Sequence, residues 1–586
     1  MTGGAGIGKT RAAEEAIVAA QGAGATVLRG ACAEERGAPA FWLWVQVIRE
    51  LARHRDAARL RALLGAGAPE VARVVTEVRD ALPGLHIPAV VDSEQARFRF
   101  FDGVSGLLRN ASRLQPLVVL LDDLQWADEP SLLLLQFLAR DLAQERVLFL
   151  ATVRDDELSP DHPLVRTLND LSTLRQTTRL VVEGFNKDEI ERFIETWTGT
   201  PAPTGLASEL HRVTGGNALF VREYVRLLTS QGGLDGLPSG ADGQRVPDSI
   251  RGVVHRRVEQ VTAPCRSLLS KASCLGRDFD VQLLTVVAQA PPATIDELLD
   301  EAAAARLIQP LRHGLGQSLG RHFQFTHALI RDVLYDEVGP RRRLRTHREI
   351  GRALEGLHAE HLEAAAPELA YHYSEGMAED ADRHRAVAYS LMAGQRAMSE
   401  FAYESALSHF ERGLAIHRAA EHAADVVSCD IALAAGEAAR LSGKPDRTRE
   451  FFERAYDDAC AIDDDLRAAR AAAGAGSGFN DAGIVERRLI DMLEDGLRRA
   501  GDADAALRSR LLACLGQAVR WENIDRAYAL ALEGVDVARA AREPQALAFA
   551  LHARHTVLHR PEDLGDRLAT AAELVRVATE IDDREM

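Results

Sequence analysis

The sequence predicts a multidomain chain of the α/β plus α class, with a parallel-sheet domain, smaller helical domains and a C-terminal helical array. Apolar runs alternate with helical patterns in the first 160 residues, which is typical of a parallel sheet. A glycine-rich stretch then interrupts the chain, and helical spacing of Ala, Leu, Arg and Glu continues from about residue 348 to the end. At 586 residues the chain is too long for one hydrophobic core, so we expect about three to five domains.

The composition is that of an ordinary globular protein, with 46% hydrophobic and 27% charged residues. A net charge of -17 argues against a broad nucleic-acid footprint, which needs clustered Lys and Arg. The six cysteines are scattered, without C-x-x-C pairs, so we expect reduced thiols and no structural metal. No apolar run approaches the roughly 20 residues of a membrane span and no signal peptide is recognisable, which predicts a cytoplasmic protein without membrane contact.

Three short apolar runs predict the strands of the parallel sheet, at residues 25–30, 117–121 and 147–152. The second, LVVLL, is apolar throughout, as parallel strands covered on both faces usually are. An Ala-rich helix is expected over residues 11–20. These elements assign residues 1–160 to the α/β domain.

The middle of the chain is predicted to hold a helical lid at residues 161–230, a linker at 231–246 and a third domain at 247–347. The linker is rich in glycine and has no periodicity. In the third domain, short helices are followed by strand-like pieces at 307–311 and 322–325, with the turn-rich HGLGQSLG between them. Short helices closed by a two-stranded wing are typical of a winged-helix domain.

Residues 348–586 are predicted to form stacked helical hairpins of the tetratricopeptide (TPR) kind. Ala393-Gly394 recurs as Ala435-Gly436, and Phe410-Glu411-Arg412 recurs as Phe452-Glu453-Arg454, both at an offset of 42 residues. Repetition of a helical pattern is the sequence signature of an α-solenoid, although the tetratricopeptide repeat is nearer 34 residues. An irregular helical bundle is the alternative.

The first ten residues, MTGGAGIGKT, contain the phosphate-binding pattern G-x-x-x-x-G-K-[ST]. In such a loop Gly3, Gly6 and Gly8 let backbone N–H groups converge on a phosphate, which the following helix N-terminus also favours. Lys9 would reach the β- and γ-phosphates of ATP or ADP, and Thr10 would ligate Mg²⁺. Only Met1 and Thr2 precede the loop, so the first strand of the expected sheet is missing. A chance glycine-rich tail is the alternative.

The ends of the second and third predicted strands supply the remaining chemistry. Asp122 is placed to hold Mg²⁺, and Asp123 to orient the attacking water. Thr152 and Arg154 are candidates to contact the γ-phosphate, for which a guanidinium fork is well suited. On spacing alone, Arg154 is equally well explained as a surface residue after a strand.

Six motifs together resemble the AAA-related STAND class of signal-transducing ATPases, and especially the large ATP-binding LuxR-type transcriptional regulators: GGAGIGKT, GAPAFWLWVQVIREL, LDDLQWAD, ATVRDDE, TGGNALFVREYV and FTHALIRDVLYDEV. The resemblance covers the whole chain in order, as P-loop NTPase, lid, winged helix and repeats. It implies alternating ATP and ADP ligands with Mg²⁺, a closed resting state, and release into a self-oligomerising or partner-binding state. It also implies that Gly8, Lys9, Thr10, Asp122, Asp123 and Arg154 take the roles given above.

The sequence departs from this family at two further places. Ala218 stands in TGGNA where the family usually has Pro beside the adenine, and the C-terminal helix-turn-helix that reads DNA in LuxR-type members is absent. Relatives contact the β-phosphate through a winged-helix histidine, and His327 is the candidate here, with Thr326 as helix cap. A histidine satisfied by local packing is the alternative for His327.

These features favour a nucleotide-dependent regulatory switch in transcription regulation, with weak ATP hydrolysis if the site is complete. Its helical repeats would sense an inducer, either a small molecule or a protein. One alternative is a helical-repeat scaffold whose nucleotide module is incomplete and inactive. Another is an ATPase motor that turns over steadily. Nothing in the chain indicates direct DNA binding.

Overall fold

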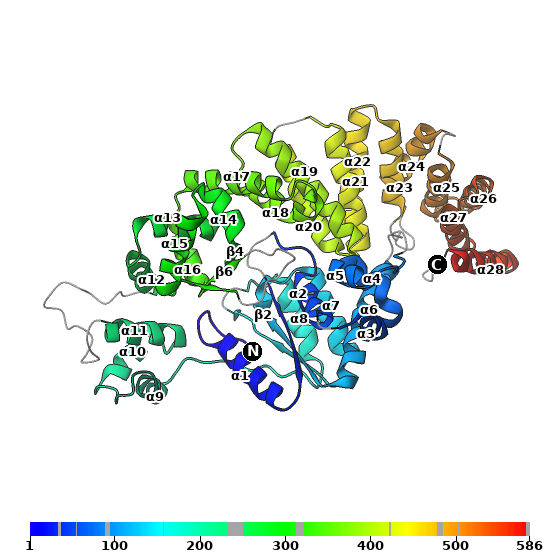
Figure 1. Ribbon diagram of the computed structural model, residues 1–586. Helices are drawn as coiled ribbons and strands as arrows, with labels where there is room; N and C mark the ends of the chain where they lie inside the picture. Colours follow the sequence, from blue (N-terminus) through cyan, green and yellow to red (C-terminus); the bar gives the residue numbers. More distant parts are fainter. Residues whose placement is uncertain are drawn as a thin grey trace. The chain divides into compact units, whose positions relative to one another are not determined.

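The computed structural model describes residues 1–32, 37–53, 55–87, 94–155, 158–230, 250–311, 321–420, 423–477, 485–501 and 504–581. The chain forms two compact units (Figure 1). The first comprises Met1–Pro88 and Phe100–Asp382, and the second comprises Ala89–Arg99 and Arg383–Met586. Within these residues, no helix has both the length and the apolar character needed to cross a bilayer.

The N-terminal part of the first unit alternates helices with three strands, as the sequence predicts. Its elements are α1 (Lys9–Gly22), β1 (Thr26–Ala31), α2 (Trp42–Ala52), α3 (Ala57–Leu64), η1 (Gly65–Gly67), α4 (Ala68–Val74), α5 (Thr76–Ala81), α6 (Glu94–Leu114), β2 (Leu117–Asp122), η2 (Leu124–Trp126), α7 (Glu129–Asp141), β3 (Val147–Ala151) and α8 (Pro163–Ser172). The part of α6 before Phe100 belongs to the second unit.

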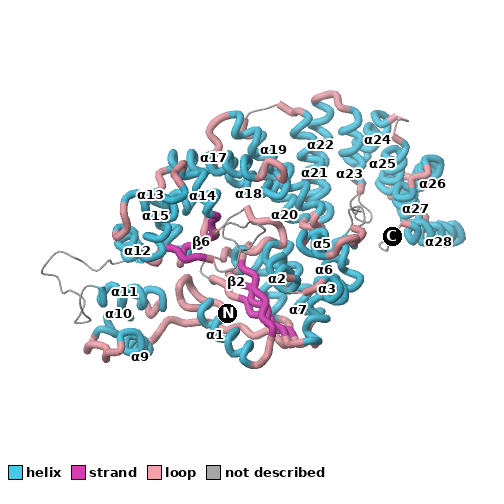
Figure 2. Tube along the Cα trace, in the orientation of Figure 1, coloured by secondary structure: helices cyan, strands magenta, loops and turns pink. Residues whose placement is uncertain are grey.

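Strands β1, β2 and β3 pair in that order and all run parallel, and they form the sheet drawn in magenta near the N-terminus in Figure 2. In register, Val27 lies beside Val118, and Val118 beside Leu148. Five of the six residues of β2 are buried, as expected for a central parallel strand. The predicted P-loop NTPase sheet is therefore confirmed.

Helices cover both faces of this sheet. On one face, Ala13 and Ile17 of α1 pack against Val27, Val118 and Leu120. Side chains alternate along a strand, so Phe149 points to the other face, where its ring centroid lies 6.1 Å from that of Trp44 in α2.

The close approach of α2 to the sheet depends on Gly30 of β1. A Cβ at Gly30 would lie 2.4 Å from the carbonyl oxygen of Leu43. A larger residue would therefore force α2 away from the sheet.

Thr2, which leads into the phosphate loop, lies between two other segments of the chain. Thr2 makes parallel bridges to Val153 on one side and to Val181 on the other. The Thr2 amide donates to Leu180 O at 2.8 Å, and the Val182 amide donates to Thr2 O at 2.8 Å. The phosphate loop thus starts from a residue that pairs with extended backbone on both sides.

Three helices follow, in the segment predicted to be a lid: α9 (Lys187–Thr198), α10 (Leu206–Thr214) and α11 (Ala218–Ser230). They share a small core that includes Ile190, Leu210 and Val221. Helix α9 starts with a capping box, in which Asn186 and Glu189 bond each other's backbone amides. The predicted linker at 231–246 lies outside the described residues.

The remainder of the first unit, to which the winged-helix prediction applies, contains a small antiparallel sheet with strand order β4-β6-β5. The sequence predicts two of these strands and misses β4. Its elements are α12 (Ile250–Glu259), α13 (Ala263–Leu275), β4 (Asp278–Asp280), α14 (Val281–Ala288), α15 (Pro292–Ala304), β5 (Ile308–Pro310), β6 (His322–Phe325), α16 (Ala328–Glu337), α17 (Pro340–Leu357) and α18 (Leu362–Glu375).

The second unit is a TPR-like array in which consecutive helices pack in sequence order. This arrangement confirms the predicted repeats. The helices are α19 (Asp380–Ser399), α20 (Tyr403–Arg418), α21 (Val426–Leu441), α22 (Pro445–Ala461), α23 (Asp465–Gly476), α24 (Arg487–Ala500), α25 (Ala505–Val519), α26 (Ile524–Ala541), α27 (Pro544–Val557), η4 (Pro561–Asp563) and α28 (Leu564–Glu580).

The sequence repeat corresponds to a repeated packing contact. A Cβ at Gly394 would lie 2.3 Å from Phe410 Cε1, and a Cβ at Gly436 would lie 2.9 Å from Phe452 Cε1. A Cβ at Gly474 in α23 would also lie 2.3 Å from Phe452 Cε1. Each phenylalanine therefore packs on helix backbone that only glycine exposes, and Phe452 joins α21, α22 and α23.

A ladder of ion pairs links alternate helices of the array. Glu411 of α20 pairs with Arg447 of α22. Arg488 of α24 pairs with Asp457 of α22 at 2.8 Å, and Arg526 of α26 with Glu494 of α24 at 2.6 Å. These pairs are largely exposed, and such pairs contribute little each to stability.

Candidate functional site

The glycine loop between Thr2 and α1 has the backbone that its sequence predicts. Gly3, Gly6 and Gly8 have φ angles of 151°, 74° and 112°, values that residues with a Cβ rarely adopt. Gly8 is the N-cap of α1, so the loop leads directly into a helix N-terminus, where anions are favoured.

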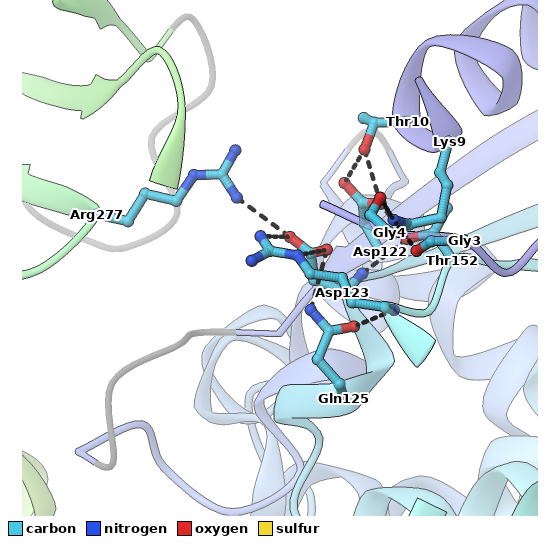
Figure 3. A network of polar contacts seen from close by, with 10 residues as sticks. Gly3, Gly4, Lys9, Thr10, Asp122, Asp123, Gln125, Thr152 and Arg277 are labelled. Carbon is cyan, nitrogen blue, oxygen red and sulfur yellow. Dashed lines mark hydrogen bonds and ion pairs between the residues drawn. The ribbon is translucent and has the colours of Figure 1, made fainter. Parts of the chain in front are cut away.

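Lys9 is buried within this loop, with 6% of its surface exposed. Its Nζ donates to Gly3 O at 2.7 Å and to Gly4 O at 2.8 Å (Figure 3). The ammonium group therefore lies at the loop itself, where the phosphates of a bound nucleotide would be held.

The loop is also in contact with the segments that precede and begin the lid helices. A Cβ at Gly3 would lie 2.6 Å from Val182 O, and one at Gly6 would lie 3.0 Å from Asn217 Oδ1. Asn217 Nδ2 donates to Ala5 O at 2.8 Å. The segment TGGNA, which includes Ala218, thus abuts the phosphate loop.

Thr10 and Asp122 meet although 112 residues separate them in the chain. Thr10 Oγ1 lies 3.3 Å from Asp122 Oδ1 and 3.5 Å from Oδ2. A hydroxyl and a carboxylate oxygen side by side are hard donors of the kind that Mg²⁺ takes, together with waters and substrate phosphates. These two residues therefore fit the predicted magnesium site.

The Asp122 carboxyl group is hydrogen-bonded by Thr152, which is fully buried. Thr152 Oγ1 donates to Asp122 Oδ1 and accepts from the Asp123 amide at 2.9 Å. Thr152 therefore supports the two acids. Burial, and secondarily the charge of Asp123, raises the pKa of Asp122, and a cation bound beside it would oppose that shift.

Asp123 has a left-handed backbone with φ of 56° and is surrounded by donors. Gln125 Nε2 donates to Asp123 Oδ1 at 3.2 Å. The Arg154 guanidinium reaches both oxygens, with Nε 3.4 Å from Oδ1 and Nη2 3.5 Å from Oδ2. Because the Arg154 side chain is only 12% exposed, it is not a solvated surface residue.

Arg277 is a member of this site that the sequence analysis missed. Its Nη1 donates to Asp123 Oδ2 at 3.2 Å, across 154 residues of chain, and Figure 3 shows the guanidinium reaching toward Asp123 from a separate segment. Gln125 was also overlooked, although it lies within the motif LDDLQWAD. The motif could have drawn attention to Gln125, whereas no local pattern marks Arg277.

His327 contacts the lid helix α11. Arg222 Nη2 of α11 donates to His327 Nε2 at 2.6 Å, which requires a neutral imidazole. Burial, and then the positive charge of Arg222, lowers the pKa of His327 to about 4. The expected helix cap at Thr326 is wrong, because His327 is the N-cap of α16 and the Thr326 hydroxyl donates to Arg306 O instead.

Comparison with known proteins gives one family match. Residues 1–150 match the sequence profile of the AAA ATPase domain. No curated protein matches the sequence.

Solved structures that are similar to the chain include the following two. One is a Signal Transduction ATPase with Numerous Domains (STAND) protein with a tetratricopeptide repeat sensor from Pyrococcus horikoshii, at 12% identity and a TM-score of 0.40, covering 100% of this chain and 81% of that one. The other is BtubC (BKLC) from P. vanneervenii, at 14% identity and a TM-score of 0.27, covering 36% of this chain and 87% of that one.

The profile match and the geometry of the loop agree. Gly8, Lys9, Thr10 and Asp122 are brought together as the motif predicts, and they lie within the matched residues. Residues 1–150 therefore group with the AAA ATPase domains as a P-loop NTPase-like domain, and TPR-like helical repeats follow it in the same chain.

Proposed function

We propose that this chain is a nucleotide-dependent regulatory switch of the STAND class, resembling the LuxR-type transcriptional regulators, that binds ATP and ADP and hydrolyses ATP slowly. The observation that carries the proposal is the meeting of Thr10 with Asp122, 112 residues apart, beside a loop that contains Lys9. An accidental glycine-rich tail would not bring these three groups together. An AAA-type domain and TPR-like repeats in one chain add support.

In this proposal, backbone amides around Gly8 and the ammonium of Lys9 bind the β- and γ-phosphates. Thr10 and Asp122 hold Mg²⁺, which neutralises developing charge on the phosphates. Asp123 orients the attacking water, and Arg154 positions Asp123 and lies near the γ-phosphate. The Thr152 hydroxyl group supports Asp122 by donating a hydrogen bond to its carboxylate.

A switch also needs contacts that differ between its two nucleotide states, since a ligand shifts an equilibrium only through differential affinity. Two contacts favour such coupling. Asn217 at the start of α11 bonds the loop at Ala5 O, and Arg277 reaches Asp123. His327 remains the candidate contact to the β-phosphate of ADP. To make that contact, its imidazole would give up the hydrogen bond with Arg222.

The helical repeats would receive the inducer, a small molecule or a protein, and nucleotide exchange would release the chain for self-oligomerisation or partner binding. The output in transcription regulation would follow from this release.

Titration of ATP and ADP against the wild type, Lys9→Ala and Lys187→Ala tests the proposal. Loss of hydrogen bonds from a charged donor should weaken ATP binding about 10- to 100-fold in Lys9→Ala. Lys187 is an exposed lysine at the start of α9 and serves as the matched control. If ATP and ADP show no saturable binding that depends on Lys9, the alternative of a helical-repeat scaffold with an inactive nucleotide module is favoured. Fast, steady ATP hydrolysis without a partner would favour an ATPase motor.

A further inference from the structure

Asp123 is bound by more donors than any other acid of the candidate site. Oδ1 faces Gln125 Nε2 and Arg154 Nε, and Oδ2 faces Arg154 Nη2 and Arg277 Nη1. A carboxylate offers about four acceptor positions in all. Donors therefore face both oxygens, and Arg277 takes one of the acceptor positions on Oδ2.

Three of these four contacts come from the sheet domain itself. Gln125 lies two residues from Asp123, and Arg154 lies 31 residues away, just past the neighbouring strand β3. Both therefore belong to the same sheet domain as the acid. Gln125 Oε1 also accepts from the Arg154 amide at 3.1 Å, which makes these two groups one rigid support.

The fourth contact is different, because Arg277 belongs to the segment between α13 and β4. Its carbonyl oxygen accepts from the Phe325 amide of β6 at 2.9 Å, so its backbone is fixed to the small antiparallel sheet. Its side chain is 34% exposed, compared with 12% for Asp123. The position of Arg277 thus follows that small sheet, and not the parallel sheet that contains Asp123.

We propose that Arg277 is a positioning residue that determines whether Asp123 has an acceptor position available for the attacking water. While Arg277 is bound, its guanidinium occupies the acceptor position on Oδ2 that the water would need. When the small sheet withdraws Arg277, one position on Oδ2 becomes available. This inference rests on the proposed function, since it assigns a partner to the acid that would orient the water.

The inference predicts the direction of a kinetic effect. Replacing Arg277 with a neutral residue should raise kcat for ATP hydrolysis about 10-fold or more, the factor that corresponds to one hydrogen bond to a charged group. KM should stay within about twofold, because Arg277 does not touch the nucleotide in this scheme. A guanidinium that instead contacted the γ-phosphate would lower kcat when removed.

The experiment compares kcat, KM and ADP affinity for wild type, Arg277→Gln, Arg277→Met and Arg277→Lys. The two neutral variants should both raise kcat, so that a folding defect in one does not remove the test, and Lys should restore a value near wild type. Arg321→Gln is the matched control, because Arg321 also lies beside the small sheet but pairs with the exposed Asp296. It should leave all three quantities unchanged.

A double variant shows whether Arg277 acts through Asp123. In an Asp123→Asn background, Arg277→Gln should change kcat by less than about twofold, because the two effects are not independent. An equal rise in both backgrounds, or a fall in the single variants, would overturn the inference. ATP binding with no rise in kcat would overturn this inference alone, whereas loss of all nucleotide binding in the wild type would refute the proposed function as well.

Discussion

The helical array is built from neighbours in the sequence, whereas the candidate nucleotide site is built from distant segments. Phe410 packs on Gly394 of the preceding helix, and Phe452 on glycines of the two helices beside its own. By contrast, 112 residues separate Thr10 from Asp122, and 154 separate Asp123 from Arg277. The array is therefore sensitive to single packing contacts, and the site to anything that moves one segment relative to another.

The largest effect is expected from Phe452→Ala. Phe452 is 4% exposed and joins three helices, so its truncation should cost about 3–5 kcal/mol of array stability. Denaturant unfolding followed by circular dichroism measures this loss. ATP affinity should remain within about twofold of wild type, because Phe452 contacts only helices of the array among the contacts described above.

Leu532→Ala is the control for Phe452→Ala, because Leu532 is 44% exposed in α26. Its cost should stay within about 0.5 kcal/mol. Equal losses in the two variants would show that the glycine contacts do not determine the stability of the array.

A smaller but more specific effect is expected from Gly3→Ala. The added methyl group would lie 2.6 Å from Val182 O, and overpacking of this kind costs about 1–3 kcal/mol. Because the loop must shift, ATP affinity should fall together with stability, unlike in Phe452→Ala. Isothermal titration combined with thermal denaturation measures both quantities.

Gly24→Ala provides the matched comparison for Gly3. Gly24 also has a positive φ, of 85°, but open space surrounds its Cβ position. This variant should carry backbone strain alone and keep its ATP affinity. If it weakened ATP binding as much as Gly3→Ala, contact with Val182 would not explain the effect.

The smallest effect is expected from the ion-pair ladder. Arg488→Ala removes pairs to Glu453 and Asp457 on helix α22, two helices earlier in the chain, and exposed pairs of this kind contribute about 0.2–1 kcal/mol. The loss should shrink further at about 1 M salt, where charges are screened within roughly 3 Å. Arg498→Ala in the same helix α24 removes only a pair within that helix, to Asp495, and should cost less.

Much of the fold could be predicted from the sequence where the signal is local. The run LVVLL marks β2 to within one residue, and the 42-residue offset between Gly394 and Gly436 reflects a contact that recurs in space. Strand β4 was missed because Asp278–Asp280 has three residues and too little pattern to recognise. The pairing of Val181 with Thr2 depends on neighbours far away in the sequence.

The candidate site was predictable only where a fixed motif carries it. Lys9, Thr10 and Asp122 belong to patterns whose spacing follows from phosphate and metal geometry. Arg277 has no such pattern, because its role arises from the position of the segment after α13. Thr326 was wrongly expected to cap α16, since its hydroxyl bonds Arg306 O, which sequence spacing does not reveal.

The left-handed backbone of Asp123 restricts which substitutions there can be interpreted. Aspartate, asparagine and glycine tolerate a φ of 56°, whereas a β-branched residue does not. Asparagine is the replacement that removes the charge while it keeps both the shape and the backbone preference. Loss of function in Asp123→Val would therefore mix a chemical defect with a distorted turn, and only the amide isolates the carboxylate.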